Sequence, residues 1–243
     1  QGDRIMIDKM VGKTEVALYG LAYSIGMLVQ LFISGMNSAL TPWMYSKIKK
    51  GDIRSMRKVL QLLSVVVVGI AVALMLISPE LVLIFGSPKY REAVYVIPPV
   101  AASVFFIFIY NILSMPQFYY EKTQFLMAAS MAAAGANVVL NFIFIRLFGY
   151  IAAGYTTLAC YMLYSVGHYI VSKRILVNEG IQENLMNPGF LLACSVFLIG
   201  ASIICNLIFP YRILRYAILL ASAGLVFWKK ELLLKTMADI RKK

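Results

Sequence analysis

The sequence predicts an all-α polytopic membrane protein. Hydrophobic residues make up 61% of its 243 residues, and the mean hydropathy is +0.79. Only 14% of the residues are charged, whereas soluble domains carry about 25%. The apolar residues are grouped into long runs, and a helix of about 20 such residues crosses the hydrocarbon core of a bilayer. Together these observations leave no stretch of the chain for a soluble domain.

About seven runs have the length and composition of membrane spans when they are delimited by clusters of charged residues. They cover residues 16–41, 59–77, 93–116, 125–146, 150–172, 189–209 and 213–228. Residues 1–8 are expected to be the end of a further helix. The chain begins at Gln1 and shows no signal peptide, so we expect a fragment whose upstream part is missing.

The distribution of basic residues predicts the orientation of the spans. One set of alternate loops, together with the C-terminal tail, carries most of the 23 Lys and Arg residues, and cytoplasmic loops hold such an excess. The C-terminus is therefore expected in the cytoplasm and the protein in the inner membrane. The formal net charge is +12, and the basic residues responsible for it border the spans instead of covering a soluble face. This position favours contact with anionic membrane lipids and argues against binding to nucleic acid.

Two basic segments have an apolar helical face and are expected to lie at the membrane interface. The first places Ile53, Met56 and Leu60 on one face, and the second is the tail 229–243.

Helix breakers mark two of the predicted spans. Pro98 and Pro99 are expected a turn or two inside the third span, where they would kink or unwind the helix. They are a candidate hinge; the alternative is an irregularity that neighbouring helices absorb. Pro42 is expected to end the first span.

Few polar side chains fall inside the spans, and these are the candidates for function because burying them in a bilayer is costly. Asp3 and Arg4 form a candidate ion pair in the first, incomplete helix. Arg4 is expected either to meet an anionic substrate in a wet cavity or to anchor the helix end at the interface. Asn137 and Asn141 are four residues apart and therefore share a helix face. They are expected to bond to a neighbouring helix or to line a polar cavity.

The sequence gives no reason to expect catalysis. Its carboxylates are not arranged as an acid/base pair, and we find no nucleophile triad and no Gly-rich phosphate loop. Cys160, Cys194 and Cys205 lie in apolar runs without metal-ligand spacing. His168 is expected near the cytoplasmic end of its span in a structural role. We expect no metal, no cofactor and no enzyme activity.

Four segments, in order, resemble the second half of polysaccharide flippases. They are DRIMIDKMVGKTEVALYGLAYSIG, NSALTPWMYSKIKKGD, YREAVYVIPP and EKTQFLMAASMAAAGANVVLNFIFIRLFGYIAAGYTTLACY. The chain is similar to lipid-linked oligosaccharide flippases of the Wzx type, within the multidrug/oligosaccharidyl-lipid/polysaccharide exporter superfamily. The resemblance covers residues 1 to about 175. Arg146 departs from the family pattern, which commonly has a proline near this position.

The resemblance implies the C-terminal lobe of a two-lobe transporter. Residues 1–172 would form this lobe, truncated in its first helix. Residues 173–228 would add further transmembrane helices, and residues 229–243 would be a basic amphipathic cytoplasmic tail. The expected partners are the missing N-terminal lobe of the same protein and polysaccharide-assembly enzymes.

The implied activity is the flipping of polyprenyl-pyrophosphate-linked oligosaccharide to the outer leaflet by alternating access, for cell-surface polysaccharide biosynthesis. Arg4 would contact the pyrophosphate or an acidic sugar, and Asn137 and Asn141 would line the cavity. Asp3 is the only carboxylate placed for ion coupling. The alternatives are a cation-coupled drug or organic-cation antiporter of the same superfamily, a membrane enzyme that processes glycolipids, and a structural scaffold.

Overall fold

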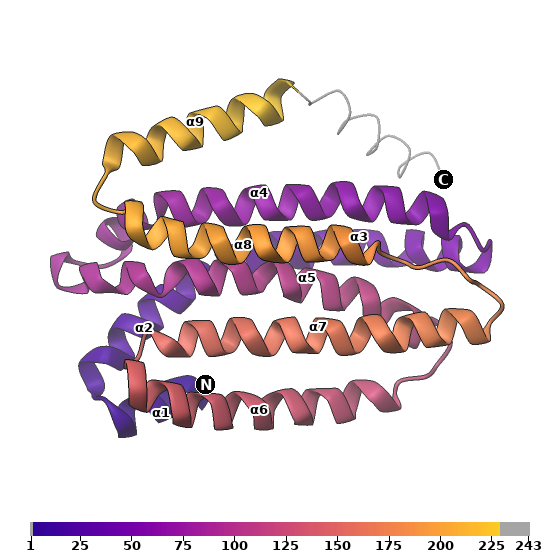
Figure 1. The fold of residues 1–243 in the computed structure, drawn as a ribbon, viewed down its shortest axis with the longest axis horizontal. Coiled ribbons are helices and arrows are strands. Elements are labelled where there is room, and N and C mark those ends of the chain that lie inside the picture. Colours follow the sequence, from indigo (N-terminus) through magenta and orange to yellow (C-terminus); the bar gives the residue numbers. More distant parts are fainter. Residues whose placement is uncertain (1, 229–243) are drawn as a thin grey trace.

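The computed structural model describes residues 2–228, and every regular element among them is a helix (Figure 1). The elements are α1 (Gly2–Met10), α2 (Lys13–Gly26), α3 (Leu28–Lys49), α4 (Ile53–Phe85), the 3-10 helix η1 (Pro88–Tyr95), α5 (Ile97–Tyr119), α6 (Gln124–Phe148), α7 (Ala152–Asn178), α8 (Pro188–Ile208) and α9 (Arg212–Trp228). The predicted all-α fold class is confirmed for this part of the chain. The predicted interfacial tail, residues 229–243, lies outside the described residues.

Each predicted span coincides in position with a helix or, for the first, with the pair α2 and α3. In the described part of the chain, five stretches are long and apolar enough to cross a membrane: Lys13–Lys49, Ile53–Phe85, Ile97–Tyr119, Gln124–Phe148 and Pro188–Ile208. The sequence-based estimate was higher because it also counted α7 and α9. α7 has 27 residues but is rich in Tyr, Ser and Thr, and α9 has only 17 residues.

The first predicted span is broken in its middle and is longer than expected. α2 ends at Gly26, and α3 continues from Leu28 to Lys49. A Cβ atom at Gly26 would lie 2.6 Å from Val100 Cγ1, so the glycine permits the close approach of α5. Pro42 lies inside α3, and the expectation that it ends the helix is therefore wrong. The hydroxyl group of Thr41 donates to the carbonyl of Asn37 at 2.8 Å in the turn that the proline disturbs.

Pro98 and Pro99 lie in the first turn of α5 instead of inside the helix. The expected kink at this position is wrong, because a proline in the first turn removes an N–H group that has no partner in the helix anyway. A Cβ atom at Gly154 of α7 would lie only 3.0 Å from Pro99 Cγ. Pro99 thus forms part of a tight contact between α5 and α7.

α5 is the central helix of the bundle and α6 lies at its edge. In the most apolar window of α5, 89% of the residues are buried, against 11% in that of α6. Figure 1 shows α6 at one edge of the bundle, followed by α7 and α5, with α4 and α9 toward the opposite edge. A hydrophobic helix that is buried on all sides packs in a core, whereas an edge helix leaves a face for other surroundings.

The predicted interfacial helix at residues 53–60 is the beginning of α4. Ile53, Met56 and Leu60 do share one face, but all three are fully buried against the bundle. The carboxylate of Asp52 caps this helix by accepting from the Ser55 N–H group at 3.2 Å. The expectation of a helix lying on the membrane surface is therefore wrong for this segment, because its apolar face packs against protein.

α9 is attached to α4 through an ion pair between the buried Arg215 and the partly buried Glu80. Nη1 and Nη2 of Arg215 lie 2.8 Å and 2.9 Å from the two carboxylate oxygens of Glu80. Nη1 also donates to the carbonyl of Leu76 at 2.7 Å. Pro79, next to Glu80, lacks the N–H group that would bond to the Met75 carbonyl, and the Ser78 hydroxyl donates to this carbonyl instead.

Candidate functional site

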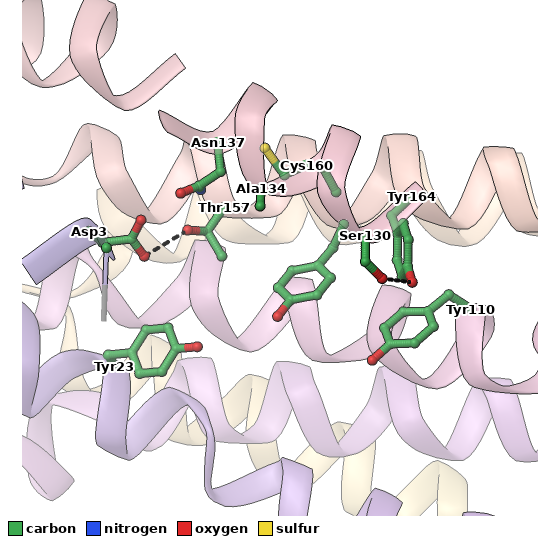
Figure 2. A pocket seen from close by; sticks show the side chains of 12 residues that line it. Asp3, Tyr23, Tyr110, Ser130, Ala134, Asn137, Thr157, Cys160 and Tyr164 are labelled. Carbon is green, nitrogen blue, oxygen red and sulfur yellow. Dashed lines mark hydrogen bonds between the residues drawn. The ribbon is translucent and has the colours of Figure 1, made fainter. Parts of the chain in front are cut away.

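A polar cavity of about 360 Å³ lies between α1, α2, α5, α6 and α7. Hydroxyl groups dominate its wall, and they belong to Tyr23, Tyr110, Ser130, Thr157, Tyr161 and Tyr164. Asp3 adds a carboxylate and Asn137 an amide. Figure 2 shows Asp3 and Tyr23 at one end of this polar cavity and Tyr110, Ser130 and Tyr164 at the other.

Asp3 joins three helices to α1 at one end of the polar cavity. Its carboxylate accepts from Tyr19 Oη of α2 at 2.9 Å, from Asn141 Nδ2 of α6 at 2.5 Å and from Thr157 Oγ1 of α7 at 3.3 Å. Neutral donors of this kind satisfy the lone pairs of a buried carboxylate. The first helix is thereby fixed to the wall of the cavity.

Asn137 and Asn141 lie on one face of α6, as their spacing predicts, and they bond to each other. Asn141 Nδ2 donates to Asn137 Oδ1 at 3.1 Å. Asn141 is fully buried and its Oδ1 also accepts from the hydroxyl of Thr156. Asn137 lines the polar cavity, whereas Asn141 lies behind it and bonds to Asp3. The structure therefore gives the two amides different positions, one facing the cavity and one supporting its wall.

Arg4 does not pair with Asp3. Neighbouring residues of a helix point about 100° apart. Arg4 turns toward Gly20 and Tyr23 of α2, while the Asp3 carboxylate lies among donors from Tyr19 of α2, from α6 and from α7. The guanidinium carbon of Arg4 lies 6.0 Å from the ring centroid of Tyr23, and 3.8 Å from where a Cβ atom at Gly20 would be. In the described part of the chain, no ion pair to a carboxylate is present for Arg4. This partly buried positive charge lies over the ring of Tyr23, which lines the polar cavity, but Arg4 itself is not among the residues that line it.

Three tyrosines form an aromatic wall at the far end of the polar cavity. The rings of Tyr110 and Tyr161 are parallel with centroids 6.2 Å apart, and the ring of Tyr164 meets Tyr110 edge-on at 4.8 Å. The hydroxyl groups of Tyr164 and Ser130 lie 2.9 Å apart and join α7 to α6. Such a wall presents flat apolar faces together with hydroxyl groups that donate and accept hydrogen bonds.

His168 packs against the aromatic wall and is fully buried within the protein. Its Nδ1 is 2.8 Å from Nε2 of Gln117 on α5, so the amide donates to the ring nitrogen. Its ring packs edge-on against Tyr164 with centroids 4.5 Å apart. These contacts agree with the expected structural role, in which the histidine supports the tyrosine wall.

Comparison of the sequence with models of protein families identifies the family of this chain. The sequence model of the MatE family matches residues 3–143, which is more than half of the chain. The chain belongs to the MatE family. MatE proteins are membrane transporters and not enzymes, within the multidrug/oligosaccharidyl-lipid/polysaccharide exporter superfamily. The superfamily named by the resemblance is therefore confirmed.

The MatE match begins at Asp3 and includes Arg4, Asn137 and Asn141, while α7 lies beyond it. The chain is also 32% identical over 132 residues to an uncharacterized membrane protein of Haemophilus influenzae. This alignment covers 51% of the chain and 31% of the length of that relative. No solved structure matches the chain.

Sequence analysis of this MatE chain missed the tyrosine wall and the two threonines of α7, Thr156 and Thr157, that bond to Asn141 and Asp3. Tyr161, Tyr164 and His168 follow each other at spacings of three and four, which places them on one face of α7. Tyrosines at this spacing are also typical of a membrane interface. Only the position of Tyr110, 51 or more residues earlier on another helix, turns them into the wall of a cavity, and no local pattern contains that information.

Proposed function

We propose that this chain forms the C-terminal lobe of a MatE transporter that moves polyprenyl-pyrophosphate-linked oligosaccharide from the cytoplasmic to the outer leaflet. The observation that carries the proposal is the polar cavity itself, because its wall combines tyrosine rings with hydroxyl and amide groups inside a bundle of apolar helices. A cavity of this kind suits a ligand that is polar at its edges and apolar on its faces.

Sugar rings have this character. Their hydroxyl groups need hydrogen-bond partners when they leave water, and Ser130, Asn137 and Thr157 supply them in the polar cavity. The C–H faces of a sugar can pack on the flat ring of Tyr110 or Tyr164. Neutral contacts dominate, so the cavity favours a large uncharged glycan over a compact ion.

Arg4 is the proposed contact for the pyrophosphate. A guanidinium group binds phosphate oxygens in a bidentate manner, and that of Arg4 has no carboxylate competing for it among the described residues. Its position over the ring of Tyr23 keeps it beside the polar cavity. In this arrangement the sugars occupy the cavity while the charged linkage stays next to Arg4.

Transport would proceed by alternating access, with this lobe rocking against an N-terminal lobe. The proposed location is the inner membrane with the C-terminus in the cytoplasm, where the basic loops contact anionic lipids. Polysaccharide-assembly enzymes are the proposed partners that supply and consume the glycolipid. Residues 173–228 would add helices beyond the lobe formed by residues 1–172.

A cation-coupled antiporter is the second candidate, and the position of Asp3 favours it. Its carboxylate lies in the wall of the polar cavity, and membrane carboxylates commonly bind protons or cations in transport. The hydrogen-bond partners of Asp3 in the described part of the chain, Tyr19, Asn141 and Thr157, are neutral donors. An organic cation would gain from this charge, whereas a pyrophosphate would be repelled by it.

The two candidates differ in the charge that each needs. We would reconstitute the full-length protein in vesicles and follow both the leaflet of a pyrophosphate-linked oligosaccharide and the efflux of a cationic dye. Arg4→Ala should slow glycolipid movement by about tenfold or more, as expected for a lost charge-assisted contact, and leave dye efflux unchanged. Arg146→Ala is the matched control, because this exposed arginine packs at 4.9 Å on Phe142, which does not line the cavity, whereas Arg4 packs on Tyr23, which does.

Two results would contradict the proposal. Equal glycolipid movement in both variants would remove Arg4 from the site. Dye efflux that is abolished by Asp3→Asn, together with no movement of any glycolipid, would establish the antiporter instead.

A further inference from the structure

The seam between α6 and α7 has a second, apolar face. Two cavities of about 430 Å³ and 570 Å³ follow each other along it. The first is lined mainly by alanines of α6 opposite Leu163 and Gly167 of α7. The second is lined by Leu140, Phe144 and Phe148 of α6 opposite the beginning of α7. We call these two cavities together the α6–α7 groove.

The two cavities contact successive stretches of α6. The first is lined by Ala128, Ala132 and Ala136 and the second by Leu140, Phe144 and Phe148, at intervals of four residues. Each such step turns by about 40° around the helix, so the lining winds around α6 along its seam with α7. The two cavities together extend along α6 for nearly its whole length. A helix of 25 residues is about 37 Å long, which exceeds the apolar core of a bilayer, about 30 Å thick.

The α6–α7 groove is continuous with the polar cavity. Ala133, Cys160 and Tyr164 line both the polar cavity and the alanine-rich part of the groove. The polar cavity contacts one side of α6 through Ser130 and Asn137. A molecule with a polar part in the cavity can thus place an attached apolar part in the groove without leaving the protein surface.

The groove also opens to the outside of the bundle. Leu163, which lines it, is 63% exposed. The small side chains of the alanines leave space in the first cavity of the groove, and no charged residue lines either cavity. An unbranched or methyl-branched hydrocarbon chain fits these surroundings, whereas a charged or bulky polar group would lose its partners there.

We propose that the α6–α7 groove binds the isoprenoid chain of the substrate while its glycan occupies the polar cavity. This inference rests on the proposed function, because it assigns a place to the lipid part of the same molecule. Since the groove runs along most of α6, the chain can stay in contact with it as the head group moves from one leaflet to the other. The groove thereby selects for a long single apolar chain next to the sugar.

Photolabelling tests the groove directly. The full-length protein in phosphatidylethanolamine and phosphatidylglycerol vesicles would receive a disaccharide pyrophosphate whose prenyl chain carries a diazirine. Adducts are expected on the residues of α6 and α7 that line the groove. Unlabelled prenyl pyrophosphate should compete with the probe, while added phosphatidylglycerol should not.

A matched pair of variants gives the second arm. Ala132→Trp fills the alanine-rich part of the groove and should lower the labelling by about tenfold, because the indole side chain would occupy the space of the prenyl chain. Met131→Trp, on the neighbouring position that is 70% exposed, should leave the labelling unchanged. Binding of the soluble disaccharide pyrophosphate without a prenyl chain should be equal in both variants.

Three results would overturn the inference. The first is an even spread of adducts over the exposed helices of the wild type. The others are equal labelling of the two variants and competition by phosphatidylglycerol. The wild-type labelling decides this even if Ala132→Trp fails to fold. A wild-type protein that moves the glycolipid but shows no labelling of the groove would overturn only the groove. Absence of glycolipid movement together with absence of head-group binding would instead refute the proposed function.

Discussion

The ion pair between Glu80 and Arg215 is expected to be a main attachment of α9 to the bundle. The side chain of Arg215 is only 4% exposed and that of Glu80 is 27% exposed. Two parallel N–H to oxygen contacts of 2.8 Å and 2.9 Å join them, and the hydroxyl of Tyr216 donates to the same carboxylate at 3.0 Å. Removing one partner of such a pair leaves a buried charge without compensation.

Arg215→Met should lower the free energy of unfolding by about 3 kcal/mol. Breaking a buried pair costs about 3–5 kcal/mol, and the partial exposure of Glu80 favours the lower end of this range. The variant also leaves the Leu76 carbonyl without its donor. For a domain of this size the loss corresponds to a decrease in Tm of about 6–12 °C. Thermal unfolding of the purified protein in detergent measures it.

Two further variants separate the ion pair from general damage. Glu80→Met combined with Arg215→Met should recover more than half of the loss, because an apolar pair of similar volume replaces a buried ion pair at little cost. Arg212→Met removes an exposed arginine of the same helix and should leave Tm unchanged. If Arg215→Met shifts Tm no more than Arg212→Met, or if the double variant is less stable than the single one, the reasoning is refuted.

Two other substitutions test the packing around the polar cavity. Asn141→Leu should destabilise the protein by about 1–3 kcal/mol, because the Asp3 carboxylate loses its donor at 2.5 Å; an unchanged Tm would show that water or another group replaces this contact. Gly26→Val should cost about 1–3 kcal/mol through overpacking against Val100, whereas Gly35→Val, at a position with open space around it, should cost less in the same Tm measurement.

The helical layout could be predicted from the sequence because it depends on local apolar runs. Residues 125–146 and 189–209, for example, differ by only one residue at most of their ends from α6 and α8. Prolines were harder to interpret, since the same residue kinks a helix interior and fits a first turn. Pro98 and Pro99 begin α5 because the preceding 3-10 helix ends at Tyr95. Their role depends on a boundary that apolar composition does not mark.

The candidate site was predictable only in part, for a related reason. Asn137 and Asn141 stand out as amides in an apolar run, and their shared face follows from their spacing alone. The separation of Asp3 from Arg4 does not, because it depends on which helices lie on each side of α1. Arg215 shows the same limit, since a basic residue near a span end is typical of an interface. Only the tertiary contact with Glu80 reveals that it is buried.

The position of α6 bears on how the polar cavity is completed in a membrane. α6 lies at the edge of the bundle, yet Ser130 and Asn137 on it line the polar cavity (Figure 2). Hydrocarbon offers no hydrogen bonds to such polar groups. Exposing an unpaired polar group to lipid tails costs several kcal/mol. Water or a second protein surface must therefore face this side of the cavity. In the proposed transporter, an opposing lobe that encloses the sugars on one side, while the proposed α6–α7 groove stays open to lipid on the other, would meet both requirements at once.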